Sequence, residues 1–183
     1  HIRNVPGRKT DVNDATWISD LLAHGLIRGS FVPPPPVQEM RELTRTRKQL
    51  VREAAQHVQR IQKTLEDANI KLDSVVTDIV GVSGMAILEA LVAGESDPER
   101  LVDLTTGRLK TPRKQLVEAL RGNVKPNHRF LLKLHLGQLA SLNKAVRDVE
   151  ARLGDVLQPF RGLEELLTTI PGVSHTTAQV ILS

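Results

Sequence analysis

The stretch that decides the fold covers residues 132–156, LKLHLGQLASLNKAVRDVEARLGDV. Its leucines and valines recur in steps of 4-3-3-4-3-4-3, which places them on one face of a helix. The residues on this face are Leu132, Leu136, Leu139, Leu142, Val146, Val149, Leu153 and Val156. The pattern predicts a long amphipathic helix, which needs a partner to cover its apolar face.

A second stretch, residues 37–72, has a similar pattern that is interrupted by Arg47. Its apolar positions are Met40, Leu43, Leu50, Ala54, Val58, Ile61, Leu65, Ala68 and Leu72. The two predicted helices can fold back on each other as a long antiparallel coiled-coil hairpin. Alternatively, each helix can pair with another subunit. The pairing within one chain and the pairing between subunits can also occur together. We expect the hairpin and a homo-oligomer formed through the coiled coil.

Several short helices are expected between these two arms, as a small insertion at the tip of the hairpin. We expect one helix at 75–80 and, after a glycine-containing turn, another at 85–92. Ser96 and Glu99 have the spacing of a capping box, with Ser96 as the cap. Thr111 and Pro112 predict a further helix with proline at its first position. The predicted fold class is therefore all-α.

Composition restricts the function further. Aromatic residues make up only 2% of the chain, so the core must consist of Leu, Val, Ile and Ala, and base stacking on exposed rings is disfavoured. The chain has no cysteine, which excludes disulfides and thiolate metal sites. It has no apolar run long enough to span a membrane. Glycine-rich phosphate loops and G-x-S-x-G are absent as well, so nucleotide hydrolysis and α/β-hydrolase chemistry have no support.

The N-terminal stretch GRKTDVNDA, residues 7–15, places two carboxylates at the start of a helix predicted over residues 12–26. Asp11 and Asp14 are three residues apart and share a helix face. Two converging carboxylates suit a hard cation such as Mg²⁺, which prefers oxygen ligands. The same spacing also fits a capped acidic first turn that the helix dipole favours, with Thr10 or Asp11 as the cap.

Two further segments contain proline. Four consecutive prolines, Pro33–Pro36, predict an extended spacer of polyproline II geometry, or alternatively a ligand for a proline-recognising domain. Near the C-terminus, Pro171 and Gly172 separate two predicted helices, the second of which begins near His175. This arrangement resembles a helix-hairpin-helix element, whose turn offers backbone N–H groups to a phosphate. An ordinary helical hairpin in a core is the alternative.

Basic residues are concentrated in two segments, which is typical of phosphate binding, although a solvated helix face has the same appearance. One segment covers 41–52. The other covers 108–133, with eight basic residues and a single acid, Glu118. We expect nucleic-acid contacts from Arg8, Lys9, Arg45, Arg47, Lys48, Arg52, Arg108, Lys110, Arg113, Lys114, Arg121, Lys125 and the backbone of Gly172. The histidines form no metal-binding pattern and are interpreted as packing or phosphate contacts.

Together these stretches resemble one family, the DEDD-type bacterial insertion-sequence transposases, which are RNA-guided recombinases. The resemblance rests on PGRKTDVNDA (6–15), SFVPP (30–34), LEDANIKL (65–72), DIVGVSG (78–84) and IPGV (170–173), taken in this order. It implies a RuvC-like N-terminal domain, a coiled coil and a C-terminal transposase domain. It also implies DNA and structured guide RNA as partners, multimers, and a bacterial cytoplasmic protein that associates with the nucleoid when active.

The family's metal site uses four acids, and Asp11 and Asp14 match the pair on its helix. By this resemblance both are catalytic and bind Mg²⁺. The family's first Asp and its Glu have no counterpart here, because the strands that carry them would lie upstream of His1. The family's serine nucleophile also has no match, because Ser174 and Ser183 lack its Ser-Gly context. We therefore expect metal-dependent strand cleavage and exchange from the intact protein, and nucleic-acid binding without cleavage from this chain, interpreted as an internal fragment.

The sequence patterns and the resemblance together predict domain boundaries. Residues 1–30 would end a RuvC-like domain, 31–36 would form the proline-rich linker, 37–157 the hairpin with its insertion at 74–123, and 158–183 the start of a transposase domain. Two alternatives remain. The chain can be a non-catalytic helical scaffold that binds nucleic acid or dimerises, or a degenerate transposase remnant.

Overall fold

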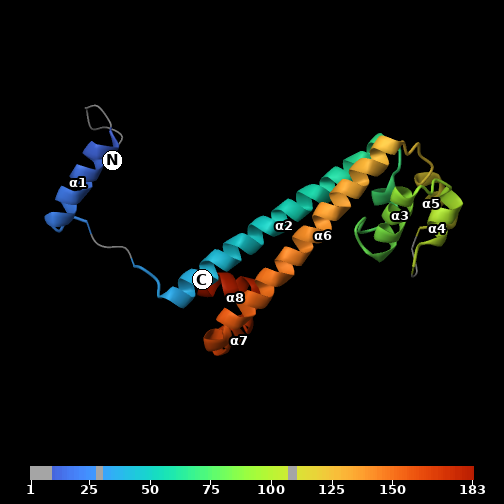
Figure 1. The fold of residues 1–183 in the computed structure, drawn as a ribbon. Coiled ribbons are helices and arrows are strands. Elements are labelled where there is room, and N and C mark those ends of the chain that lie inside the picture. Colours follow the sequence, from blue (N-terminus) through green and yellow to red (C-terminus); the bar gives the residue numbers. More distant parts are fainter. Residues whose placement is uncertain (1–9, 28–30, 107–110) are drawn as a thin grey trace. The chain divides into compact units, whose positions relative to one another are not determined.

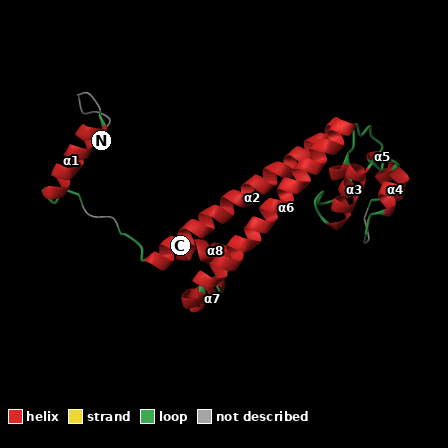
Figure 2. Ribbon diagram, in the orientation of Figure 1, coloured by secondary structure: helices red, strands yellow, loops and turns green. Residues whose placement is uncertain are grey.

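The computed structural model describes residues 10–27, 31–106 and 111–183, and the chain divides into two units, His1–Pro35 and Pro36–Ser183, which are treated separately below. Within these ranges the secondary structure is entirely helical (Figure 2), which confirms the predicted all-α class. No helix in the described ranges is both long and apolar enough to cross a membrane. The α-helices are α1 (Asp11–Ala23), α2 (Pro35–Asp67), α3 (Val82–Ala93), α4 (Pro98–Asp103), α5 (Arg113–Ala119), α6 (Pro126–Val156), α7 (Arg161–Thr168) and α8 (His175–Leu182).

The second unit is built on α2 and α6, which lie side by side as an antiparallel hairpin (Figure 1). Arg152 Nε donates to Glu39 Oε1 at 2.9 Å near one end of the pair. His57 and His135 meet further along, so partner numbers on α6 fall as numbers on α2 rise. Apart from Thr64, the buried residues of the two arms come from the two predicted apolar faces, and include Ile61 and Leu132. The predicted hairpin within one chain is confirmed.

The first arm differs from its prediction at both ends. α2 begins at Pro35, so Pro35 and Pro36 are helical and only Pro33 and Pro34 lie outside the helix. The prediction of four extended prolines was wrong because proline fits the first turn of a helix, where its missing N–H costs no hydrogen bond. The arm ends at Asp67 rather than residue 72, because Asn69 adopts a left-handed conformation with φ 58°. Ile70 N then donates to Leu65 O and Asn69 N to Glu66 O, a Schellman motif that closes the helix.

The insertion packs at the tip of the hairpin, as predicted, and shares one hydrophobic core with it. Ile87, Leu88 and Leu91 of α3 are fully buried in this core. Two backbone hydrogen bonds fasten the base of the insertion, Lys71 N to Ala119 O at 2.8 Å and Asn123 N to Ala68 O at 2.7 Å. The tip is therefore part of the same folded body as the arms.

Four local predictions in the insertion were wrong. Helix α3 begins at Val82 rather than residue 85, so most of the predicted turn before it is helical. Residues 75–80 form no helix, because the Asp78 side chain accepts from Val80 N and holds a turn. The cap of α4 is Asp97, whose Oδ1 accepts from Glu99 N at 3.0 Å, and not Ser96. Pro112 is the residue before α5 rather than its first residue. In the two last cases the helix starts one residue later than the sequence pattern indicates.

The predicted helix–turn–helix near the C-terminus is confirmed as α7 and α8. Ser174 caps α8 by accepting from Thr177 N at 3.3 Å. Ala178 of α8 is fully buried. A second core cluster formed by Met40, Leu153 and Leu157 packs against Leu182, so α8 is held beside the start of α2.

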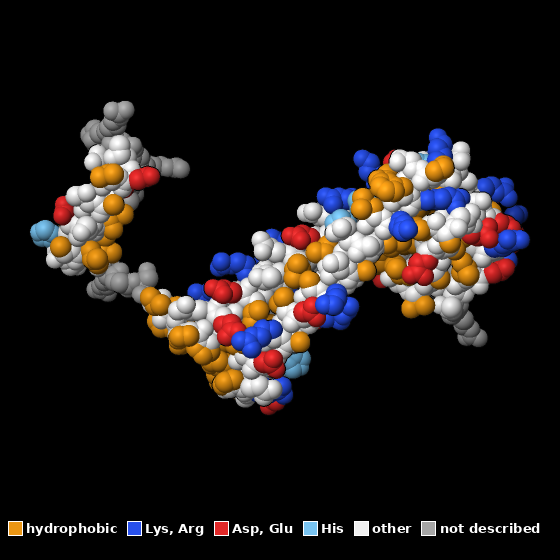
Figure 3. Space-filling view, in the orientation of Figure 1, with side chains coloured by type: hydrophobic (Ala, Val, Ile, Leu, Met, Phe, Trp, Pro, Cys, Tyr) orange, Lys and Arg blue, Asp and Glu red, His pale blue; other side chains and the backbone are white. Residues whose placement is uncertain are grey.

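The first unit contains α1, which ends at Ala23 rather than at residue 26, with His24 as its cap. No residue of α1 is buried. Ile18, Leu22 and Leu26 of the predicted apolar face are 50%, 59% and 73% exposed. Among the described residues of its unit, this face therefore has no core to cover it, and apolar side chains lie along its surface in Figure 3.

Candidate nucleic-acid interface

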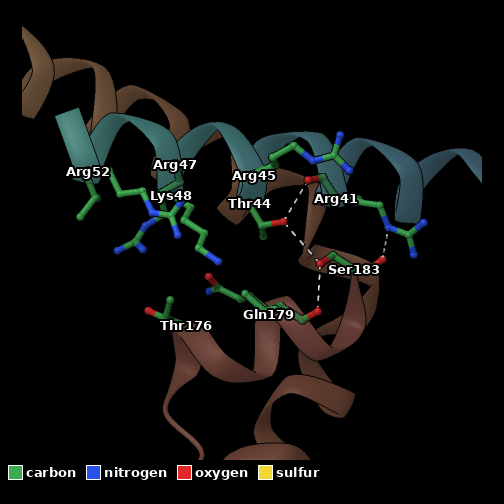
Figure 4. A pocket seen from close by; sticks show the side chains of 11 residues that line it. Arg41, Thr44, Arg45, Arg47, Lys48, Arg52, Thr176, Gln179 and Ser183 are labelled. Atoms are coloured by element: carbon green, nitrogen blue, oxygen red, sulfur yellow. Dashed lines mark hydrogen bonds between the residues drawn. The ribbon is translucent and has the colours of Figure 1, made fainter.

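A groove lies between α2 and α8, and we call it the α2–α8 groove. It has a volume of about 500 Å³. Its lining residues are Arg41, Thr44, Arg45, Arg47, Lys48, Val51 and Arg52 of α2, with Thr176, Gln179, Val180 and Ser183 at α8. Figure 4 shows the basic side chains along α2, with Lys48 extending toward Thr176 and Gln179. The lining contains five basic residues and no acid.

Two kinds of contact hold α8 in this position. The Met40 cluster packs against Leu182. In addition, Arg41 Nε donates to Ser183 O at 2.8 Å, and Thr44 Oγ1 lies 3.4 Å from Ser183 Oγ. A basic side chain beside the last carbonyls of a helix also complements the helix dipole. The groove is therefore a product of tertiary packing, and its two walls are more than a hundred residues apart in the sequence.

Four of the basic residues form one row. Arg41, Arg45, Lys48 and Arg52 follow each other in steps of four, three and four, so they share a face of α2. Their span along the helix is about 16 Å, at 1.5 Å per residue. All four side chains are exposed. We call this row the basic row.

The basic row keeps most of its charge available. Among the residues that the structure describes, no acidic side chain lies within ion-pair distance of Arg45, Lys48 or Arg52. Arg47 differs, because its Nη2 lies 2.7 Å from Glu150 Oε1 on α6. Arg47 therefore helps to join the arms, and its charge is largely neutralised.

The second basic segment, at the tip, is arranged differently. Arg113 donates to Asp103 at 2.7 Å and to Glu99 at 2.8 Å, and these two carboxylates raise the pKa of its guanidinium. Arg121 lies 3.6 Å from Glu118. The surface depression that contains Arg113, Lys114 and Arg121 also contains both glutamates. Figure 3 shows basic and acidic side chains interspersed at this end of the hairpin.

The remaining predicted contacts are more scattered. Lys125 precedes α6 and its backbone N–H donates to His128 Nδ1 at 3.3 Å. Gly172 lies in the turn before α8 with φ 87°, a conformation that favours glycine. At the start of α8 the Thr177 N–H already donates a hydrogen bond to the side chain of Ser174. Arg8, Lys9, Arg108 and Lys110 lie outside the described residues.

The groove includes residues that were not among the predicted contacts, chiefly Arg41, Thr176 and Gln179. The spacing of Arg41 relative to Arg45 and Lys48 is a signal that the sequence offers. For Thr176 and Gln179 no such signal exists, because their position depends on how α8 packs. Gln179 Nε2 also donates to Glu164 Oε1 at 2.9 Å, which fixes its amide.

Asp11 and Asp14 lie in the first turn of α1, as expected. Thr10 is the cap, since its side chain accepts from Asn13 N at 3.3 Å and its carbonyl accepts from Asp14 N at 3.0 Å. Their oxygen donors suit Mg²⁺. In the described ranges, however, no group of three or more His, Cys, Asp or Glu comes together. The two aspartates therefore fit part of a magnesium ligand set.

Comparison with known proteins identifies the N-terminal part of the chain. A family model, DEDD_Tnp_IS110, described as Transposase, matches residues 1–70, which include Asp11, Asp14 and the basic row. No curated protein and no solved structure matches the chain. The resemblance inferred from the sequence motifs is confirmed over residues 1–70, which match the IS110-type transposase family.

Proposed function

We propose that this chain acts in a DNA transposase that moves an insertion sequence by metal-dependent strand cleavage and exchange, and that it holds nucleic acid in the α2–α8 groove. The transposase family supports DNA as the substrate. The observation that carries the groove assignment is the basic row. It faces the α8 wall of the groove, and no acidic residue lines the groove.

The groove recognises the sugar–phosphate backbone. Arginine binds phosphate oxygens in a bidentate manner, and lysine binds them as a point charge. Thr176 adds a hydroxyl that can donate to a phosphate oxygen. Backbone contacts of this kind position a nucleic acid without reading its sequence. The α2–α8 groove therefore serves structured guide RNA or DNA, and sequence recognition comes from base pairing or from other residues.

Asp11 and Asp14 are the residues that would hold Mg²⁺ in this proposal, as two ligands of a larger set. Bound Mg²⁺ supplies charge neutralisation and orientation of phosphate oxygens. The contribution of the chain itself is positional. The Thr10 cap fixes the first turn of α1, so both carboxylates leave the helix on one face. The chain also assembles as a homo-oligomer in this proposal.

The test compares two triple variants with the same loss of charge. Arg45→Gln, Lys48→Gln and Arg52→Gln remove three charges from the basic row. Lys114→Gln, Arg121→Gln and Lys133→Gln remove three exposed charges from the second basic segment. Binding to duplex DNA and to a structured RNA is measured by fluorescence anisotropy over a series of salt concentrations.

We expect the basic-row variant to bind at least about tenfold more weakly, with a salt slope reduced by about 0.9 for each lost phosphate contact. The control should change affinity by less than about threefold. Equal losses in both variants would show that only net charge matters. No binding by the wild type at low salt would favour the scaffold alternative. The stronger of the two wild-type affinities identifies RNA or DNA as the ligand of the groove.

A further inference from the structure

Two histidines meet across the middle of the hairpin. His57 of α2 and His135 of α6 have Nδ1 atoms 3.3 Å apart. Their ring centroids are 5.3 Å apart, and the ring planes are inclined by 60°. Both side chains are half-buried, so they have access to solvent. Neither belongs to the α2–α8 groove or to the segment of Asp11 and Asp14.

The distances match those of two imidazoles that share one metal ion. With Zn–N bonds of about 2.0–2.1 Å and tetrahedral angles, two ligating nitrogens lie about 3.3–3.4 Å apart. If each ring points its nitrogen at the ion, the centroids lie about 5.2 Å apart. The observed 5.3 Å between the centroids fits a shared ion, and without an ion the same two nitrogens lie within hydrogen-bond distance of each other.

We propose that His57 and His135 form a binding site for Zn²⁺ or a similar divalent transition-metal ion, which links α2 to α6. Imidazole nitrogen suits Zn²⁺, Ni²⁺ and Cu²⁺, whereas Mg²⁺ prefers oxygen. The site is thus chemically distinct from the aspartate pair on α1.

A neutral imidazole is the form that binds metal. Among the described residues no third His, Cys, Asp or Glu joins the pair. Water completes the coordination, and the bound ion can dissociate.

Binding to this pair requires the folded hairpin, because the ligands come from two arms that separate on unfolding. An ion that binds only the folded state stabilises it by mass action. Zn²⁺ should therefore raise the unfolding midpoint of the hairpin in proportion to the logarithm of its concentration above Kd.

The experiment titrates the full chain with ZnCl₂ at pH 7.5 by calorimetry and follows its thermal unfolding. His57→Gln and His135→Gln each remove one ligand. His175→Gln is the matched control, because His175 is exposed and faces Glu164 instead. Imidazole nitrogen NMR of the wild type gives a second readout that does not depend on whether the variants fold.

We expect one Zn²⁺ per chain, at least about tenfold weaker binding in either ligand variant, and wild-type affinity in the control. Zinc should raise the unfolding midpoint of the wild type and the control only. In the NMR spectra, two of the six histidines should shift on zinc addition. Absence of binding by the wild type, equal binding by the ligand variants, or shifts at other histidines would overturn the proposal.

Discussion

Arg47 of α2 lies 2.7 Å from the carboxylate of Glu150 on α6 and joins the two arms of the hairpin, whereas Arg45, two residues earlier, has no acidic partner among the described residues. The two arginines come from one basic segment of the sequence, but only one is free to bind a ligand. Helical geometry explains this division, because residues two apart point to different sides of a helix.

The first prediction concerns this pair. Arg47→Gln should lower the free energy of unfolding by about 0.5 to 1 kcal/mol, since the ion pair is partly exposed. It should change nucleic-acid affinity little. Arg45→Gln should do the reverse, weakening binding with no measurable loss of stability. Urea unfolding and anisotropy binding check both variants. If Arg47→Gln weakened binding as much as Arg45→Gln, the assignment of Arg47 to the hairpin would be wrong.

The second prediction concerns Gly84 in α3. A Cβ atom at this position would lie 2.2 Å from the carbonyl oxygen of Ile79, which is backbone and cannot move aside easily. Gly84→Ala should therefore destabilise the protein by about 3 kcal/mol. Gly137→Ala in α6 is the matched control, because nothing lies within 4 Å of its added Cβ. The control should stabilise the protein by about 1 kcal/mol, since alanine is the better helix former. Thermal unfolding distinguishes the two, and a neutral Gly84→Ala would contradict the close approach.

Some local features of the fold could be predicted from the sequence and others could not. The two arms were predictable because their apolar faces repeat over many turns of helix. The Pro171–Gly172 turn was predictable because proline and glycine break helices locally. The turn at Asp78 was not, because Val76 and Ile79 are spaced like a helix face but are buried by a turn that the Asp78 side chain holds.

The candidate site shows the same limit. The basic row could be predicted from composition and spacing, and the place of Asp11 and Asp14 in a first helical turn from the cap before them. The other wall of the groove could not, because α8 reaches it through the contact of Leu182 with the Met40 cluster. Ion pairing also decides which basic residues stay available to bind phosphate. The sequence does not show that Arg113 pairs with Asp103 and Glu99.

The third prediction tests the link between this cluster and the groove. Met40 is fully buried where α2, α6 and α8 meet. Met40→Ala should cost about 3 kcal/mol of stability and loosen α8. Nucleic-acid affinity should fall although no charge is removed. Leu88→Ala, at the tip, should cost a similar amount and leave affinity unchanged at temperatures where the chain is folded. Equal affinities for the two variants would show that α8 contributes nothing to the groove.

The fourth prediction concerns α1. Its 13 residues include no buried side chain, and isolated helices shorter than about 12–15 residues are marginal in water. Backbone amides of α1 should exchange with solvent far faster than those in the middle of α6. Hydrogen exchange followed by mass spectrometry measures both segments in one sample. Protection of α1 equal to that of α6 would contradict the prediction and indicate that its apolar face is covered.

The last prediction concerns pH. Burial lowers the pKa of His135 in the folded protein, and His57 and Arg60 add to this effect, while an unfolded histidine titrates near pH 6.5. Below about pH 6.5 the unfolded state therefore binds more protons than the folded state, and the free energy of unfolding falls as the pH falls. The loss continues until the pH reaches the folded pKa of His135 and then stops.

His135→Gln removes this contribution, so its stability should decline less steeply between about pH 7 and pH 5. His175→Gln should keep the steeper decline of the wild type. Urea unfolding at several pH values, in the presence of a metal chelator, measures the slopes, and identical slopes for wild type and His135→Gln would show that burial of this imidazole does not couple folding to pH.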